Sequence, residues 1–335
     1  MKRGKITVKT NLLENISEYI KENNDYLIIG HIDPDGDAIG SIMAFKFLLD
    51  RLGKNSLLLL HSDIIKEYDI LFNYLDKDEY YIPENSIDFD KLSNYKNTVV
   101  LDTATAERLG NYKRIINTHY IINIDHHHDN TKYGNINYIN SEDPAVGKII
   151  FDIAKLFNQK PNGKLGTAIA LAVLADTGSL KYPSSNSDTF RLIADLKELD
   201  IDVVEINRFL QSYPSLEYLI MLAKGLKNIK MSKDKKVAWL SLSKKEINEL
   251  DIDEKDIKNL VNYPKDIKGV EVGISFVERK IDFVDISFRS HSYVDVSRIA
   301  HKFDGGGHPR ASGAKIHGDF NKVVKDVISE VKLNV

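Results

Sequence analysis

Histidine and aspartate side chains crowd into one short stretch of the sequence, GHIDPDGDAIGS, at residues 30–41. The stretch directly follows an apolar run, YLII, that begins at Tyr26. Its ionisable residues are His31, Asp33, Asp35 and Asp37. Because carboxylates this close together repel one another, the stretch is either a solvated polar turn or a site that binds divalent cations.

Two familiar loop types do not fit this stretch. An EF-hand loop counted from Asp33 would need glycine at its sixth position and glutamate at its twelfth, where the sequence has Ala38 and Ala44. A dinucleotide-binding turn offers glycine amides, rather than carboxylates, to a pyrophosphate. The metal-site interpretation therefore depends on ligands from other parts of the chain.

Three further acidic or histidine features occur at the ends of predicted elements. Asp102 follows the apolar run TVVL, the stretch DHHHD at residues 125–129 follows YIINI, and Asp176 closes an apolar helical pattern. A lone aspartate after a strand is commonly a cap or a turn residue. Four such features in one domain instead favour a shared metal site.

The elements that must position these residues alternate between apolar runs and helical patterns. Strands are predicted over Tyr26–Ile32, Ser56–His61, Thr98–Leu101 and Tyr120–Ile124, with a helix over Ala38–Leu52. Short apolar strands separated by helices predict an α/β fold with a parallel sheet covered on both faces. Ligands of such sheets bind at the carboxyl ends of the strands, where the aspartates and histidines lie.

The second half of the chain predicts a smaller α+β domain. Residues 188–230 show a helical pattern with a break at Pro214. Strands are then predicted over Val237–Leu242, Val270–Val277 and Ile281–Phe288, followed by a helix over Val294–Phe303 and a loop over 304–310. We expect a first domain over 1–195, a helical connector over 196–215 and a second domain over 216–335.

Composition and charge exclude several classes of protein. The 335 residues include no cysteine, so disulfides and thiolate zinc sites are excluded. The longest apolar stretches are too short to span a membrane and the first residues lack the apolar segment of a secretory signal, so a cytoplasmic protein without a membrane partner is expected. The net charge of −3 and a small basic patch at residues 289–317 suit a short anionic substrate, not a long nucleic-acid duplex.

The candidate ligands are carboxylates and imidazoles, a set that suits Mn²⁺ or Mg²⁺. So many carboxylates exceed the need of one ion and indicate two ions that share a carboxylate. Two such ions about 4 Å apart stabilise both the attacking and the leaving oxygen of a phosphoryl displacement. The sequence therefore predicts a two-metal site of a kind suited to phosphoryl displacement.

Five stretches resemble the DHH phosphoesterases. GHIDPDGDAIGS, VVLDTA, NIDHHHDN and ALAVLADTGS resemble the four motifs of that family in order, and SFRSHSYVDVSRIAHKFDGGGHPRASGAKI resembles its DHH-associated second domain. The chain is similar to the two-domain nanoRNase type, which implies an active site in the cleft between the domains. It also implies hydrolysis of short oligoribonucleotides and of 3′-phosphoadenosine 5′-phosphate.

Four other functions are alternatives to this one. Hydrolysis of cyclic di-AMP or of linear di-AMP uses the same motifs and stays open. A pyrophosphatase is disfavoured by the GGGH and RS elements, and a nucleotide-binding module without catalysis is disfavoured because every expected ligand is present. A long-strand exonuclease is disfavoured because no additional single-strand-binding domain is evident.

The resemblance implies a role for each position. One Mn²⁺ would be held by His31, Asp35 and Asp102. The other would be held by Asp37, Asp102, His126 and Asp176, with the carboxylate of Asp102 shared. Asp125 would orient an imidazole and His127 would face the scissile phosphate, while Asp33 and His128 have no assigned role. The implied substrate contacts in the second domain are Arg289, Ser290, Gly305, Gly306, Gly307 and His308.

One segment departs from the family pattern. Where the family has a small hydroxyl pair and then a glutamate at the start of a helix, this chain has Ala145-Val146-Gly147-Lys148. Lys148 is expected to be a solvated helix residue, with a contact to an extra phosphate as the alternative. The sequence leaves the physiological substrate, the direction of attack and the oligomeric state open, with a homodimer among the alternatives.

Overall fold

The computed structural model describes residues 13–83, 86–211, 215–249, 257 and 260–335. The chain divides into two compact units, Met1–Ser212 and Tyr213–Val335, and each is described by itself. The predicted domain limits, with a connector over 196–215, stay a prediction. The predicted helix break at Pro214 lies outside the described residues.

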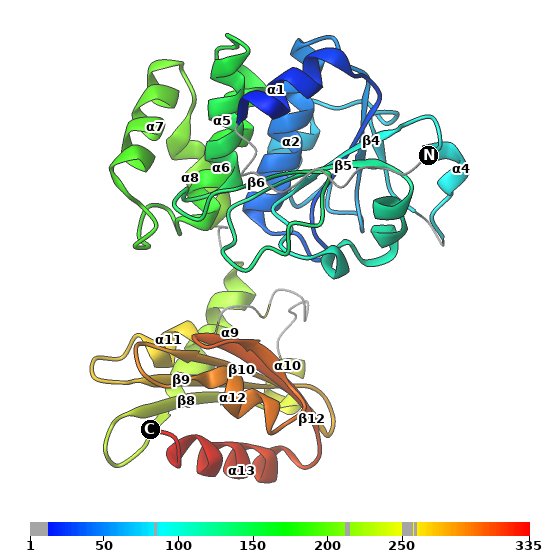
Figure 1. Cartoon of the computed structure of the whole chain (residues 1–335). Helices are drawn as coiled ribbons and strands as arrows, with labels where there is room; N and C mark the ends of the chain where they lie inside the picture. Colours follow the sequence, from blue (N-terminus) through cyan, green and yellow to red (C-terminus); the bar gives the residue numbers. More distant parts are fainter. Residues whose placement is uncertain (1–12, 84–85, 212–214, 250–256, 258–259) are drawn as a thin grey trace. The chain divides into compact units, whose positions relative to one another are not determined.

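The first unit is built on a parallel sheet. In chain order it contains α1 (Leu13–Glu22), β1 (Tyr26–Ile29), α2 (Gly36–Arg51), β2 (Ser56–Leu59), α3 (Asp69–Phe72), β3 (Tyr80–Tyr81), α4 (Phe89–Leu92), β4 (Asn97–Leu101), the 3₁₀ segment η1 (Ala106–Asn117), β5 (Tyr120–Asp125), β6 (Ile136–Ile139), α5 (Val146–Leu156), α6 (Gly163–Asp176), α7 (Ser187–Glu198) and α8 (Val203–Gln211). The described strands pair in parallel in the order β3-β2-β1-β4-β5-β6. Figure 1 labels β4, β5 and β6 of this sheet. The predicted parallel sheet is therefore confirmed. Strands β1 and β2 end earlier than predicted, because the chain leaves the sheet at Gly30 and Leu60 to form loops at its edge.

Helices cover both faces of this sheet, as the uniformly apolar strands predicted. Alternate residues of a strand point to opposite faces. Tyr26 and Ile28 of β1 belong to a core that includes residues of α1, α2, α5 and α6. Leu27 and Ile29 belong to a second core with residues of α4 and η1.

The strand order reverses between β1 and β4, and this reversal places the candidate site. From β1 the chain adds β2 and β3 on one side, and it then returns to add β4, β5 and β6 on the other. Ligands of open α/β sheets bind at the carboxyl ends of the strands at such a reversal. The start of α2 also lies against the end of α6, because a Cβ atom on Gly36 would lie 2.4 Å from Ala175 Cβ.

The second unit is a smaller α+β domain, as predicted. It contains α9 (Leu216–Lys227), β7 (Lys230–Met231), β8 (Val237–Leu242), α10 (Lys244–Asn248), α11 (Asn262–Lys265), β9 (Val272–Lys280), β10 (Phe283–Ser290), α12 (Val296–His301), β11 (Gly306–His308), β12 (Ala311–His317) and α13 (Phe320–Lys332). Its described strands have the order β11-β12-β10-β9-β8-β7, with β8 and β9 parallel and the other neighbours antiparallel. Residues of α12 and α13 share one core with the sheet, and residues of α9 and α10 share another (Figure 1).

The predicted loop over 304–310 is partly wrong. Gly306–His308 forms the edge strand β11, which pairs antiparallel with residues 311–313 of β12. Gly307 has a φ of +135°, which side chains other than hydrogen rarely tolerate, so the glycine permits this tight hairpin. The run of glycines predicted a loop because glycine has a low propensity for strands.

None of the described helices is both long and apolar enough to cross a membrane. The predicted cytoplasmic location stays a prediction. The predicted place of the active site, in a cleft between the two units, stays a prediction as well.

Candidate metal centre

The six predicted metal ligands lie together at the carboxyl edge of the first sheet. They follow β1, β4 and β5, start α2 or end α6. Ligand atoms within 4.8 Å of one another form three overlapping groups: His31, Asp35 and Asp102; Asp37, His126 and Asp176; and Asp102, His126 and His127. The first group is the one predicted for one ion, and the second lacks only Asp102 of the set predicted for the other.

Asp102 lies at the centre of these groups. Its side chain is only 2% exposed, with Oδ2 3.7 Å from His31 Nε2 and Oδ1 3.7 Å from His126 Nε2. Its backbone is in the left-handed region, with a φ of 53°. Aspartate is one of the few side chains that tolerate this conformation. The turn at the end of β4 therefore aims a buried carboxylate between two imidazoles.

The carboxylate of Asp37 is buried and joins two helices. It lies in the first turn of α2, and it accepts hydrogen bonds from the backbone N–H groups of Val146 (2.8 Å) and Gly147 (3.2 Å) at the start of α5. Ser41 Oγ donates a third bond of 2.9 Å. The side chain of Ala145 cannot cap α5, so Asp37 acts as the cap from outside the helix.

The departure at residues 145–148 is explained by this contact. Backbone amides, not side chains, of Val146 and Gly147 face Asp37. A Cβ atom on Gly147 would lie 2.5 Å from Ala172 Cβ, so glycine lets α5 approach α6. The Lys148 ammonium group forms ion pairs with Asp152 and Asp143. It is half-buried rather than solvated, and its charge is already paired.

Both histidines among the predicted ligands turn Nε2 toward the carboxylates. His31 Nδ1 lies 2.7 Å from the Ile32 carbonyl oxygen, and His126 Nδ1 lies 3.1 Å from the Asp143 carbonyl oxygen. A carbonyl oxygen only accepts, so each contact places the ring proton on Nδ1 and leaves the Nε2 lone pair for a cation. Burial lowers the pKa of His31, and the Arg108 charge acts in the same direction, which favours the neutral ring.

Asp125 and His127 form a separate pair. Asp125 is fully buried, and its Oδ1 accepts a hydrogen bond from His127 Nδ1 at 2.8 Å. Its Oδ2 accepts a bond of 2.6 Å from Asn130 Nδ2. Burial alone would raise the pKa of Asp125, but the bonds from His127 and Asn130 outweigh it and the pKa is lowered. The same bond raises the pKa of His127.

Sequence reasoning missed two residues beside the site. Asn130 Nδ2 also contacts Asn123 Oδ1 at 2.9 Å, so a buried amide network holds Asp125 from behind. Asn130 is the last residue of NIDHHHDN, and its closeness to Asp125 in the sequence could have indicated this role, since a buried carboxylate needs hydrogen-bond donors. Arg108 Nη2 lies 3.0 Å from His31 Nδ1, and this contact between η1 and the loop after β1 has no local sequence signal.

The donor set fits divalent cations. Asp102 Oδ1 is buried and accepts no hydrogen bond within the described part of the chain. Burial, and then the neighbouring carboxylates, raise the pKa of Asp102, and burial raises the pKa of Asp37 to about 7. Such crowding is unfavourable unless positive charge compensates it. Cations bound by these oxygens and by the two Nε2 atoms would supply that charge.

In the second unit, several predicted substrate contacts have structural partners. Ser290 is 7% exposed, and its hydroxyl donates to the Val294 carbonyl oxygen at 2.7 Å. Arg310 Nη1 donates to the same carbonyl at 2.7 Å. Arg289 is half-buried at the end of β10, and its Nη1 donates to the Phe288 carbonyl oxygen at 3.0 Å. The hydroxyl of Ser290 therefore holds the turn after β10.

The three glycines of the GGGH element have different surroundings. A Cβ atom on Gly305 would lie 2.2 Å from the Gly313 carbonyl oxygen, and one on Gly307 would lie 2.6 Å from the Ala311 carbonyl oxygen. A Cβ atom on Gly306 would meet nothing within 4 Å. The fold thus explains two of the glycines, and Gly306 faces open space. His308 lies in β11, but its side chain is outside what the structure describes.

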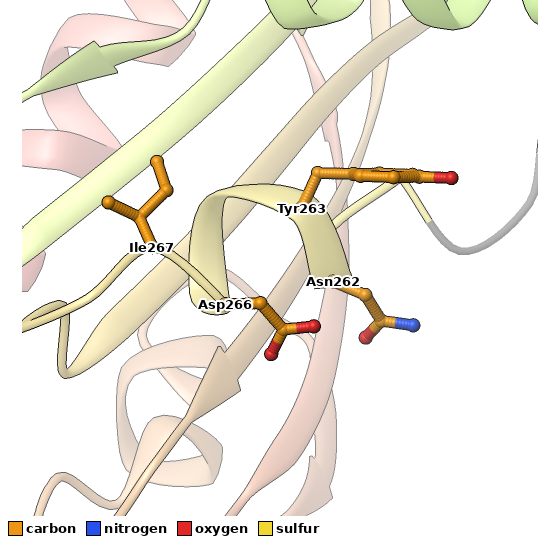
Figure 2. Close-up of a pocket in the computed structure, with 4 residues that line it drawn as sticks. All are labelled: Asn262, Tyr263, Asp266 and Ile267. Atoms are coloured by element: carbon orange, nitrogen blue, oxygen red, sulfur yellow. The ribbon is translucent and has the colours of Figure 1, made fainter.

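A pocket of about 370 Å³ also lies in the second unit, at α11. Figure 2 shows its lining residues: Asn262, Tyr263, Asp266 and Ile267. Asp266 is already paired with Lys265 at 2.7 Å. None of the predicted substrate contacts is among these lining residues.

Each of the two units matches the profile of a known protein family or domain. The profile of the DHH family, N-terminal domain, matches residues 25–177, and that of the DHHA1 domain matches residues 234–333. The bifunctional oligoribonuclease and PAP phosphatase NrnA of Thermus thermophilus is 26% identical, with 91% of this chain and 88% of that protein aligned. Its namesake from Bacillus subtilis is also 26% identical, with 96% of this chain and 97% of that protein aligned.

Solved structures share the fold. An exopolyphosphatase-related protein from Bacteroides fragilis superposes with a TM-score of 0.85 at 24% identity, covering 96% of this chain and 95% of that chain. RecJ from Thermus thermophilus in complex with Mn²⁺ has a TM-score of 0.55 at 12% identity, covering 96% of this chain and 53% of that chain. At these identities the likeness supports the two-unit architecture alone.

Proposed function

Since the chain belongs to the DHH family and its second unit carries a DHHA1 domain, we propose that it hydrolyses short oligoribonucleotides and 3′-phosphoadenosine 5′-phosphate. The observation that carries this proposal is the group of carboxylates and imidazoles that surrounds the buried side chain of Asp102. Relatives aligned over nearly their whole length are named for these two activities. The proposed reaction is metal-dependent hydrolysis of a phosphoester bond.

We propose that two Mn²⁺ ions bind at this edge, with Mg²⁺ as a weaker substitute. One would be held by His31, Asp35 and Asp102. The other would be held by Asp37, Asp102, His126 and Asp176. Bound divalent cations would supply a hydroxide near neutral pH and stabilise the charge on the phosphoryl oxygens. Imidazole ligands favour Mn²⁺ over Mg²⁺ at a site otherwise rich in oxygen.

His127 is proposed to act on the substrate rather than on a cation. Asp125 Oδ1 accepts a hydrogen bond of 2.8 Å from His127 Nδ1, so the other ring nitrogen, Nε2, is directed away from Asp125. The raised pKa keeps this ring protonated to higher pH than an ordinary histidine. A protonated imidazole donates a hydrogen bond to a phosphoryl or leaving oxygen as negative charge develops there.

The second domain is proposed to select short substrates. Arg289 and the glycines of the GGGH element would contact a phosphate of the substrate other than the scissile one. A dinucleotide uses such contacts fully, whereas a long strand gains nothing further. The cytoplasmic location belongs to the same proposal, because such RNA fragments arise inside the cell, and a homodimer stays an open alternative.

The test is metal-dependent turnover on a panel of substrates. The panel comprises a dinucleotide, a strand of about twenty nucleotides, 3′-phosphoadenosine 5′-phosphate and cyclic di-AMP. We expect hydrolysis of the dinucleotide and of 3′-phosphoadenosine 5′-phosphate with Mn²⁺, far slower hydrolysis of the long strand, and none in chelator. A preference for cyclic di-AMP, or equal rates on both strand lengths, would contradict the proposal.

A further inference from the structure

Arg108 is fixed beside the candidate metal centre by its own backbone. Its carbonyl oxygen accepts a hydrogen bond of 2.8 Å from Ile32 N, and its N–H donates to the Thr105 carbonyl oxygen at 3.1 Å. The next residue, Leu109, is 1% exposed and belongs to the core between η1 and the sheet. The guanidinium is thereby held against the loop that carries His31.

The contact between Arg108 and His31 brings two donors together. Arg108 Nη2 lies 3.0 Å from His31 Nδ1, yet that nitrogen also lies 2.7 Å from the Ile32 carbonyl oxygen. The carbonyl can only accept, so the proton resides on Nδ1 and Arg108 has no acceptor there. Within the described part of the chain, no carboxylate forms an ion pair with Arg108. The partly exposed guanidinium is therefore open to an anionic acceptor from solution.

The charge of the site indicates what that acceptor is. The four carboxylates proposed as ligands would cancel the charge of two divalent cations, and Asp125 is already bonded to His127. The loaded centre would then attract an anionic substrate weakly. A guanidinium beside His31 restores a local positive charge, and its fork of N–H groups matches phosphate oxygens.

We infer that Arg108 forms a phosphate-binding subsite within the DHH domain, next to the cation held by His31. Its ligand is the phosphate group of a nucleotide, bound directly by the guanidinium. This inference rests on the proposed function and deepens it. It adds a phosphate contact in the first domain to the substrate contacts that the resemblance implies in the second.

The experiment measures binding rather than turnover. AMP and adenosine, which differ only by the phosphate, are titrated into the Mn²⁺-loaded full chain by calorimetry, and Mn²⁺ content is measured in parallel. The variants are Arg108→Met, which keeps the apolar stem, and Arg108→Lys, which keeps a charge. The matched control is Arg114→Met, because Arg114 lies on the same segment with its guanidinium over the Phe89 ring at 5.1 Å.

We expect Arg108→Met to weaken AMP binding by about tenfold to a hundredfold, the range for a lost charge-assisted hydrogen bond. Adenosine binding and Mn²⁺ content should not change, Arg108→Lys should be intermediate, and Arg114→Met should match the unmodified protein. Unchanged AMP affinity in Arg108→Met overturns the inference. So does loss of Mn²⁺ together with AMP, which would make Arg108 a positioning residue for His31. Failure of the unmodified protein to bind AMP would contradict the proposed function itself.

Discussion

Carboxylates at two places in the molecule differ in how they are hydrogen-bonded. One place is the carboxyl edge of the first sheet, and the other is the turn after β10 in the second unit. At the first, Asp102 Oδ1 is buried without a hydrogen-bond partner, and burial raises the pKa of Asp37 to about 7. At the second, Glu271 accepts bonds from Ser292, Tyr293 and Val294. The Asp102 carboxylate is thus left to bind a ligand, whereas the Glu271 carboxylate is occupied in holding the turn.

The largest effect is expected at the carboxylate between the two imidazoles. Asp102→Asn removes its charge but keeps its size and its tolerance of positive φ. Loss of a carboxylate shared by two cations should lower kcat/KM by roughly 10³-fold or more, with the fold intact. Asp33→Asn is the matched control, because Asp33 also has a φ of 53° but is exposed and belongs to none of the ligand groups. Near-normal turnover in folded, Mn²⁺-replete Asp102→Asn would remove the contrast between the regions.

Two glycines of the second unit differ in the space around them. Gly305→Ala places a methyl group against the Gly313 carbonyl oxygen and should destabilise the domain by about 2 kcal/mol. Gly306→Ala has open space, so stability should stay within about 0.5 kcal/mol. If a substrate phosphate approaches the backbone here, Gly306→Ala should raise KM for a dinucleotide by about tenfold. Equal unfolding midpoints for the two variants, or an unchanged KM in Gly306→Ala, would refute this division of roles.

Positions at the ends of strands could be predicted from the sequence, whereas contacts between residues far apart in the chain could not. Asp102 and Asp125 were placed at one edge because each follows or ends an apolar strand, and the carboxyl ends of parallel strands lie at the same edge. The bonds from Val146 to Asp37 and from Arg108 to His31 join residues far apart in the chain. Hydrophobic periodicity does not predict such contacts, since they depend on how helices, strands and loops pack together in the folded domain.

The turn after β10 shows the converse. The resemblance implies a substrate contact for Ser290, and that contact stays a prediction. The hydrogen bonds that join its hydroxyl to Val294 and Arg310 could not be predicted from the sequence. The edge strand at Gly306–His308 was missed for a similar reason, because pairing with β12 outweighs the low strand propensity of glycine.

Acid should weaken the scaffold through Glu271. Burial alone would raise its pKa, but the hydrogen bonds from residues 292–294 outweigh it and the pKa is lowered. Its stabilisation is therefore complete above the ordinary glutamate pKa of about 4.3 and is lost as pH falls through the lower folded-state value. Glu271→Gln should cost about 1 kcal/mol or more at pH 6.

That cost should shrink at acid pH, when Glu271 of the unmodified protein also becomes neutral. Urea unfolding followed by fluorescence reports the second unit selectively, since the single tryptophan, Trp239, lies in β8. Asp326→Asn, an exposed change on α13, is the control. A cost that stays constant from pH 6 to acid would show that the charge of Glu271 contributes nothing.

The smallest effect is expected for Ser290→Ala. The Val294 carbonyl oxygen keeps its bond from Arg310, so the loss should be about 1 kcal/mol of stability. Turnover of a dinucleotide should stay within about threefold of normal, since a structural hydroxyl contributes less than one such bond to catalysis. A rise in the KM for a dinucleotide well beyond threefold would indicate that Ser290 contacts the substrate.

The most direct test of the account is anomalous diffraction from crystals soaked in Mn²⁺. Asp102 lies between both ligand groups, with Oδ2 near His31 and Oδ1 near His126. We predict two peaks about 4 Å apart, each in contact with one oxygen of Asp102. A single peak, or a second peak that does not touch Asp102, would contradict the shared two-metal centre.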